Sequence, residues 1–164
     1  MIRRAQPGDV DAIVGFIGDL AEYERARHEV QIDAPSLHAA LFGPAPAVFG
    51  HVAVVDGDVV GFALWFLSFS TWLGRHGIYL EDLYVRPEHR GGGHGRALLV
   101  ALARIAVERG YGRLEWAVLD WNEPALAFYR SLGAVALDEW TVHRLTGDAL
   151  RLVAARADRY HPGP

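Results

Sequence analysis

Residues 78–109 constrain the fold more than any other stretch, because a strand, a glycine-rich loop and a helix follow one another there without interruption. β-branched and aromatic side chains predict the strand over residues 78–85, and Pro87 marks the turn after it. The loop reads Arg-Gly-Gly-Gly-His-Gly-Arg over residues 90–96. The next apolar residues recur with the period of one helix face: Leu98, Leu99, Leu102, Ile105 and Ala106. N–H groups at a helix start lack internal partners, and glycine lets a phosphate approach them, so the segment predicts a site for a phosphorylated ligand.

The residues that this loop lacks narrow the choice of ligand. A P-loop requires Gly-Lys-Ser/Thr after its glycines, and the chain contains no lysine. A dinucleotide-binding loop requires G-x-G-x-x-G, and here the last position is Arg96 or Leu98, depending on where the pattern starts. The pattern that fits is Arg/Gln-x-x-Gly-x-Gly/Ala, with Arg90, Gly93 and Gly95 in the defined places.

This loop, directly after a strand that ends Leu-Tyr-Val-Arg-Pro, resembles the pyrophosphate loop of the GNAT superfamily of N-acetyltransferases, which binds acetyl-CoA. The resemblance implies an α/β (α+β) GNAT fold, in which a mixed, mostly antiparallel sheet is splayed at the cofactor strand pair and flanked by helices. Residues 20–24 (LAEYE), 79–85 (YLEDLYV) and 121–129 (WNEPALAFY) are more closely similar to the diamine (spermidine/spermine) and thialysine N-acetyltransferase branch.

The resemblance also implies where acetyl-CoA binds. The central strand is expected to bulge, so that its backbone near residues 83–85 bonds the pantetheine arm. Residues 90–96 are expected to hold the pyrophosphate, with Arg90 and Arg96 adding charge-assisted contacts. His94 either contacts a phosphate or faces solvent, and Asn122 either caps a helix or also contacts the pantetheine. The full set of expected cofactor residues is Leu83, Tyr84, Val85, Arg90, Gly91, Gly92, Gly93, His94, Gly95, Arg96, Asn122, Pro124 and Ala125.

Two residues are candidates for the chemistry of acetyl transfer. A free alkylamine titrates near 10.4, so only about one molecule in a thousand is nucleophilic at neutral pH, and a base must take its proton. Glu81 matches the proposed base of the similar family, although an isolated glutamate there is also an ordinary strand-edge carboxylate. Tyr129, in Asn-Glu-Pro-x-x-x-x-Tyr, matches the tyrosine that protonates the departing thiolate; without that motif it reads as a core residue beside Phe128.

The acceptor is expected to be a cationic amine. Acidic groups attract such a molecule, and aromatic faces bind a cation. The candidates for acceptor binding are Tyr23, Glu24, Trp72, Glu81 and Asp82. The diamine branch often has an acidic residue shortly before the loop tryptophan, whereas Ser70 and Thr71 precede Trp72 here. This departure counts against spermidine itself.

Composition limits the remaining properties. A chain of 164 residues that is 51% hydrophobic suits one domain, expected over residues 1–155, with a disordered tail at 156–164. The net charge of −4 argues against nucleic-acid binding, and the absence of cysteine excludes disulfides and thiolate catalysis. The chain shows no long apolar span and no metal-ligand spacing among its histidines. A cytoplasmic enzyme without a metal or a membrane partner is therefore predicted, and the resemblance implies a homodimer.

The residue pattern predicts a β-α-α-β-β-β-α-β-α-β order with a terminal helix. Asp9 is expected to cap the first helix and Asn122 the one before Gly133. Asp56-Gly57-Asp58 is a hairpin signal. The expected strands are 2–5, 49–55, 59–67, 78–85, 113–119 and 140–145, with a loop at 68–77 that contains Trp72; the expected helices are 10–25, 34–42, 96–109, 123–132 and 147–155.

Three functions remain open at this point. An acetyl-CoA-dependent N-acetyltransferase of a small amine, using Glu81 and Tyr129, is favoured. A protein N-terminus, a lysine or an aminoglycoside is the rival acceptor. A non-catalytic acyl-CoA-binding regulator is the alternative outside enzymes, because a fold alone does not fix a function.

Overall fold

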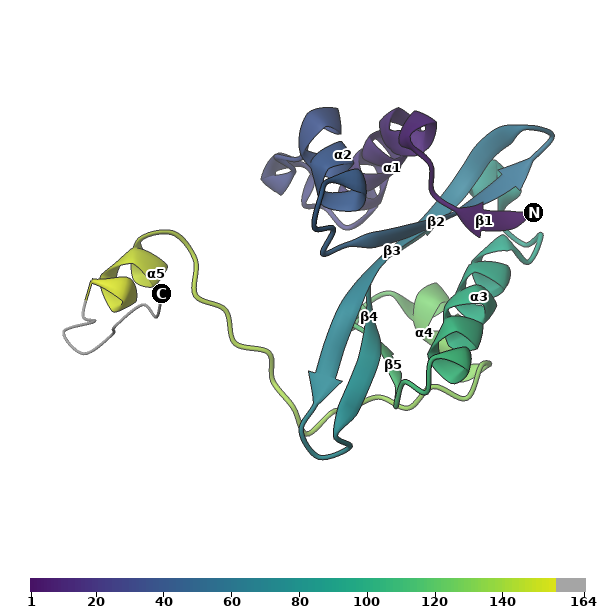
Figure 1. Cartoon of the computed structure of the whole chain (residues 1–164). Coiled ribbons are helices and arrows are strands. Elements are labelled where there is room, and N and C mark those ends of the chain that lie inside the picture. The colour runs from purple at the N-terminus through teal and green to yellow at the C-terminus, as the bar shows by residue number, and fades with distance from the viewer. Residues whose placement is uncertain (156–164) are drawn as a thin grey trace. The chain divides into compact units, whose positions relative to one another are not determined.

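The computed structural model describes residues 1–155. The chain divides into two compact units, Met1–Trp121 and the residues from Asn122 onward. The first unit contains a five-stranded sheet in the order β1-β2-β3-β4-β5 (Figure 1). Its strands are β1 (Ile2–Arg4), β2 (Phe49–Val55), β3 (Asp58–Ser70), β4 (Arg75–Val85) and β5 (Leu114–Trp116). The first four strands pair antiparallel, and β5 pairs parallel to β4, so the predicted mixed sheet is confirmed.

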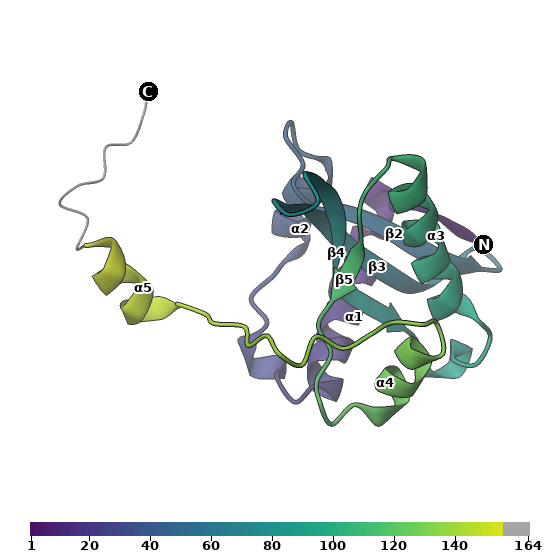
Figure 2. The same cartoon turned by 90° about the horizontal axis from the view of Figure 1, so that it is seen from below.

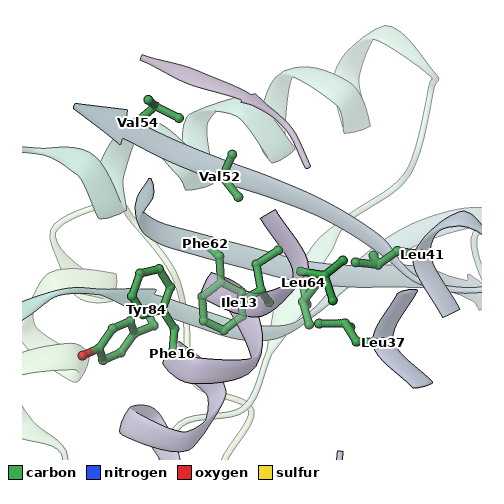
Figure 3. Packing of buried hydrophobic residues seen from close by; sticks show 10 residues of the cluster. Ile13, Phe16, Leu37, Leu41, Val52, Val54, Phe62, Leu64 and Tyr84 are labelled. Atoms are coloured by element: carbon green, nitrogen blue, oxygen red, sulfur yellow. The ribbon is translucent and has the colours of Figure 1, made fainter. Parts of the chain in front are cut away.

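Helices cover both faces of this sheet. Helices α1 (Val10–Tyr23) and α2 (Ala34–Phe42) lie on one face, and α3 (His94–Glu108) lies on the other (Figures 1 and 2). The main apolar cluster forms between α1, α2 and the sheet, where the ring of Phe16 lies 6.1 Å from Phe62 and 5.4 Å from Tyr84 (Figure 3). On the other face, α3 buries four of the five predicted face residues: Leu98, Leu99, Leu102 and Ala106.

Strand β4 contains the irregularity that organises the site. Leu64 of β3 pairs with Asp82 and the next residue, Trp65, pairs with Leu80, so Glu81 is the extra residue of a β-bulge. On its other side β4 pairs with β5 only over Ile78–Leu80. Beyond the bulge the two strands separate, which produces the splayed sheet that the resemblance implied.

Three elements of the first unit differ from the prediction. The expected loop at residues 68–77 is mostly strand, since β3 and β4 stay paired to Ser70 and Arg75. The strand expected at 113–119 is only Leu114–Trp116, because β5 loses its partner where β4 bulges. Asp9 is the N-cap residue of α1, as predicted, but its side chain makes no capping hydrogen bond; the carboxylate instead accepts hydrogen bonds from the Arg3 guanidinium at 2.6 and 2.8 Å.

The second unit contains two helices, α4 (Glu123–Arg130) and α5 (Gly147–Ala154). The strand predicted at residues 140–145 is wrong, because the described residues between the two helices form no strand. Apolar and β-branched residues suggested a strand there, but a strand exists only with a hydrogen-bonded neighbour. The tail predicted at residues 156–164 lies outside the described residues.

The buried His51 of β2 predicts a loss of stability in acid. Its Nδ1 atom accepts a 3.1 Å hydrogen bond from Nε1 of Trp65. Burial, together with the charge of Arg4, lowers the pKa of His51 from 6.5 to about 4. Between these values the unfolded chain binds a proton that the folded chain does not, so the free energy of unfolding should fall as pH drops from 6.5 to 4. The full effect is about 3 kcal/mol, at about 1.4 kcal/mol per pKa unit.

Denaturant titrations at several pH values check this expectation. His51→Asn retains an acceptor for Trp65 without titrating in that range, so its stability should vary less with pH than that of the wild type. His28→Asn removes an exposed histidine and serves as the control. If the free energies of unfolding of the wild type and His51→Asn differ by the same amount from pH 7 to pH 4, the assignment is contradicted.

Candidate active site

The glycine loop has the backbone shape that an anion site requires. Gly91 and Gly93 both adopt φ of 79°, a left-handed conformation that side chains disfavour. A Cβ atom added at either position would meet no heavy atom within 4 Å, so open space lies beside the loop. Gly93 is the N-cap of α3, and no side chain caps this helix start. A pyrophosphate fits such a site, because the first-turn N–H groups of a helix and its dipole both favour an anion.

Arg90, at the start of the loop, is held by three groups of the protein. Its Nε atom donates a 2.9 Å hydrogen bond to the carbonyl oxygen of Val85. Its guanidinium carbon lies 5.6 Å from the ring centre of Tyr84 and 5.8 Å from that of Tyr23. From the sequence, Arg90 was expected to add a charge-assisted contact to the pyrophosphate. The structure shows Arg90 linking the loop to the end of α1.

The other predicted loop residues lie at the start of α3 or directly before it. Gly92 and Gly95 complete the glycine run, and Arg96 is exposed in the first turn of α3. His94 is half-buried, with its ring 6.3 Å from that of His89. The preceding strand residues Leu83 and Val85 are half-buried at the part of β4 that β5 has left.

Because of the bulge at Glu81, the neighbouring acidic side chains of Glu81 and Asp82 have different surroundings. Directly paired residues share a face of a sheet, so Asp82 lies with its partner Leu64 on the face that α1 covers. Burial, with the charges of Glu81 and Glu24, raises the pKa of Asp82 to about 6. Burial also raises the pKa of Glu24. Glu81 itself is exposed. The three carboxylates therefore form a negative site whose half-buried member, Asp82, is costly to ionise without a nearby cation.

Two aromatic side chains pair near the end of α1, where Tyr23 directly precedes Glu24. Tyr23, at the end of α1, has its ring 5.9 Å from that of Trp121, which ends the first unit. The guanidinium of Arg25 lies 5.2 Å from the Trp121 ring, and Arg25 has φ of 62°, uncommon for a residue other than glycine. Trp121 was not singled out as a site residue from the sequence. Its signal was present, since it opens the Trp-Asn-Glu-Pro stretch that resembles the family.

Trp72 is not brought to the other acceptor candidates of the first unit. It lies in the turn between β3 and β4 and is 88% exposed. Residues 75–82 of β4 separate this turn from Asp82, about 25 Å at about 3.3 Å per strand residue. Within one chain, Trp72 is therefore remote from the acidic residues.

The remaining candidates belong to the second unit. Asn122 caps α4, with its side-chain oxygen accepting from the N–H of Ala125 at 3.4 Å, as predicted. Pro124 occupies the first turn, where its missing N–H costs no hydrogen bond. Tyr129 lies one turn further along α4 with its ring 5.3 Å from that of Phe128.

An open mixed sheet, a bulged central strand and a glycine loop at a helix start together define an acyl-CoA-dependent transferase fold. The acetyltransferase (GNAT) family matches residues 11–134, across the boundary between the two units, and the chain belongs to this family. The family uses acetyl-CoA as its co-substrate, and the chain is an acyltransferase that transfers an acetyl group to an amine.

Similar proteins also confirm the predicted branch. A thialysine N-epsilon-acetyltransferase of Bos taurus is 41% identical over 169 residues, covering 95% of this chain and 98% of that protein. An L-ornithine N5-acetyltransferase of Arabidopsis thaliana is 45% identical over 197 residues, covering 93% and 86%. An integron cassette protein from the mobile metagenome of V. cholerae has a similar structure, with a TM-score of 0.78, 28% identity and coverage of 94% and 96%.

The described part of the chain contains neither a metal-binding cluster nor a helix that could span a membrane. Among residues 1–155, no cluster of three or more histidine, aspartate or glutamate side chains has the arrangement of a metal site. Over the same residues, no helix has both the length and the apolar composition that crossing a membrane requires.

Proposed function

We propose that this enzyme acetylates a primary amine of a small cationic molecule, a basic amino acid or a diamine or polyamine. The observation that supports this acceptor class is the set of three interacting carboxylates around the β4 bulge, Glu24, Glu81 and Asp82, of which Glu24 directly follows the aromatic Tyr23. An ammonium group there offsets the cost of ionising the half-buried Asp82. The two relatives named above act on thialysine and ornithine, amino acids with a side-chain amine, which favours a basic amino acid.

In the proposed mechanism each group has one task. Asp82 and Glu24 bind the ammonium form of the acceptor. Glu81, exposed at the bulge, accepts the amine proton through water, and the neutral amine then attacks the thioester carbonyl directly. The backbone of β4 beyond the bulge stabilises the charge that develops on the carbonyl oxygen. As the carbon–sulfur bond breaks, Tyr129 donates its phenolic proton to the departing thiolate, and the proton that the amide nitrogen then loses restores the phenol. The loop at residues 90–96 holds the pyrophosphate throughout.

A panel of amines tests the acceptor class through the rate of CoA release. Thialysine, L-ornithine and spermidine should be acetylated with higher kcat/KM than a peptide N-terminus, a lysine peptide or an aminoglycoside. Of the three, the amino acids should exceed spermidine. Faster turnover of the peptides or the aminoglycoside would contradict the proposal.

The loop assignment predicts a selective effect of Gly93→Ala. A Cβ atom stands where the loop must approach the pyrophosphate, so the affinity for CoA should fall at least tenfold. Gly110→Ala is the matched control, because Gly110 lies just beyond the other end of α3 with φ of 67° and equally open surroundings. Both variants should lose about 1–2 kcal/mol of stability, because a residue with a Cβ atom is strained in the left-handed conformation. Unchanged calorimetric affinity for CoA in Gly93→Ala would remove the loop from the cofactor site.

We further propose that the chain forms a homodimer. Among the described residues, exposed apolar side chains gather at the β3–β4 turn and in the second unit, and they include Phe69, Trp72, Leu73, Val135, Trp140 and Val142. Exposed apolar clusters of this kind often mark interfaces between proteins. Light scattering at micromolar concentration should give twice the chain mass of 18.1 kDa. A monomer under those conditions would refute the proposal.

A further inference from the structure

The face of the sheet that carries the acidic bulge extends across to β5. Asp82 pairs with Leu64 of β3. Tyr79 pairs with Phe66, two residues beyond Leu64 on the same strand. Residues two apart on a strand share a face, so Tyr79 lies on the same face as Asp82. On the other edge of β4, Tyr79 pairs with Glu115 of β5 (Figure 2). Glu115 therefore belongs to the same face of the sheet as the proposed acceptor site.

A cation and an anion stand side by side at this end of the face. Nε of Arg113 lies 2.7 Å from Oε2 of Glu115. Arg113 is exposed, and its stem lies against β4, because a Cβ atom added to Gly77 would lie 3.0 Å from its Cγ atom. Burial raises the pKa of Tyr79, and the charges of Glu81 and Glu115 raise it too, so both carboxylates act on its hydroxyl. The Arg113–Glu115 pair and the bulge thus lie on either side of Tyr79.

The spacing between the two sets of charged groups matches the length of a basic amino acid. Asp82 and Tyr79 stand about 7 Å apart along the sheet, since their β3 partners are two residues apart at about 3.3 Å each. Glu115 lies one strand further across, about 5 Å away. In ornithine or thialysine, four or five single bonds of about 1.5 Å separate the side-chain amine from the α-carbon, a reach of about 5–7 Å. With its amine at the bulge, such a molecule therefore brings its head group to the Arg113–Glu115 pair.

We propose that Arg113 and Glu115 form a subsite for the head group of an amino acid acceptor, in which Arg113 binds the α-carboxylate and Glu115 binds the α-ammonium group. This inference rests on the proposed function and adds to it the residues that select an amino acid over a diamine. Charge-assisted hydrogen bonds to both residues are available only to a head group that carries both charges. The second ammonium group of a diamine is attracted by Glu115 but repelled by the adjacent guanidinium, so it gains little.

Three acceptors with the same reacting amine test the subsite in the wild type. L-ornithine carries both head-group charges, 1,4-diaminobutane lacks the carboxylate, and 5-aminopentanoate lacks the α-ammonium group. From the rate of CoA release, kcat/KM for L-ornithine should exceed that for either analogue by about tenfold or more, as expected for a lost hydrogen bond to a charged group. This comparison needs no variant, so it does not depend on how any substitution folds.

Variants assign the two charges to the two residues. Arg113→Gln should lower kcat/KM for L-ornithine about tenfold and change that for 1,4-diaminobutane less than about twofold. Glu115→Gln should also lower it for L-ornithine, but not for 5-aminopentanoate. Arg104→Gln is the matched control, because it removes the same charge from an exposed position on α3, on the other face of the sheet. A purely structural role of the pair predicts instead a loss of thermal stability and an equal loss of activity on all three acceptors.

The outcomes separate this inference from the proposed function. If the wild type acetylates 1,4-diaminobutane as efficiently as L-ornithine, or if Arg113→Gln loses activity equally on both, the subsite is overturned and the proposed function stands. A wild type that binds CoA but acetylates none of the three amines would overturn both.

Discussion

Tyr129→Phe should lower kcat by about 10²- to 10⁴-fold, the usual loss when a general acid is removed. The variant retains the ring that packs 5.3 Å from Phe128, so α4 should remain folded. The affinity for CoA should stay near that of the wild type, because only the phenolic proton is missing. Steady-state kinetics combined with CoA calorimetry on the same sample measures both quantities.

Tyr111→Phe provides the matched control for this variant. The hydroxyl of Tyr111 accepts a 3.4 Å hydrogen bond from the Arg109 guanidinium, and Tyr111 plays no part in the proposed site. Loss of the Tyr111 hydroxyl should leave kcat within about twofold of the wild type. Near-normal turnover in Tyr129→Phe would remove Tyr129 from the mechanism, and a parallel loss of folded protein would assign it a structural role.

Glu81→Gln should give the second large effect, a decrease in kcat of about 10²- to 10⁴-fold at neutral pH. The defect should shrink as pH rises. Below its pKa near 10.4, an amine gains about tenfold in its neutral form for each unit by which the pH rises. At high pH the solvent therefore supplies the neutral amine that the missing base would have produced. Profiles of kcat against pH from 6.5 to 9.5 for wild type and variant test this expectation.

Asp82→Asn is the informative comparison for Glu81. Asp82 is paired with Leu64 on the α1 face, and its proposed task is to bind the cation. This variant should therefore raise KM for the amine more than it lowers kcat, and higher pH should not rescue it. A defect in Glu81→Gln that is independent of pH would move Glu81 from proton acceptor to binding residue.

The sequence predicted those elements whose signals are local. Helix α2 occupies residues 34–42 as expected, because Asp33 caps it through the N–H of Ser36 and Gly43 follows its last residue. The glycine loop and the Asn122 cap were likewise visible in short runs of residues. Each of these features depends on side chains within a few positions of one another.

Features that depend on pairing between distant strands were not predictable in the same way. The bulge was expected from resemblance alone, and only the register of β3 against β4 assigns the extra residue to Glu81. A one-residue irregularity reverses which side chains face α1, so strict alternation would place Asp82 with Leu80 on the wrong face. The contact of Arg90 with Tyr23, 67 positions apart in the chain, has no local signal either. The strand predicted at residues 140–145 failed for the converse reason, since strand-forming residues there have no paired neighbour.

Mass spectrometry of the acceptor after incubation with acetyl-CoA tests most directly whether this chain transfers an acetyl group to a small amine. Thialysine or L-ornithine should gain one acetyl group on the side-chain amine, in an amount equal to the CoA released. Tyr129→Phe, with unchanged CoA affinity, should form the same product far more slowly. Tight binding of acetyl-CoA with no acetylated amine from any member of the panel would contradict the proposal and leave an acyl-CoA-binding protein without this activity.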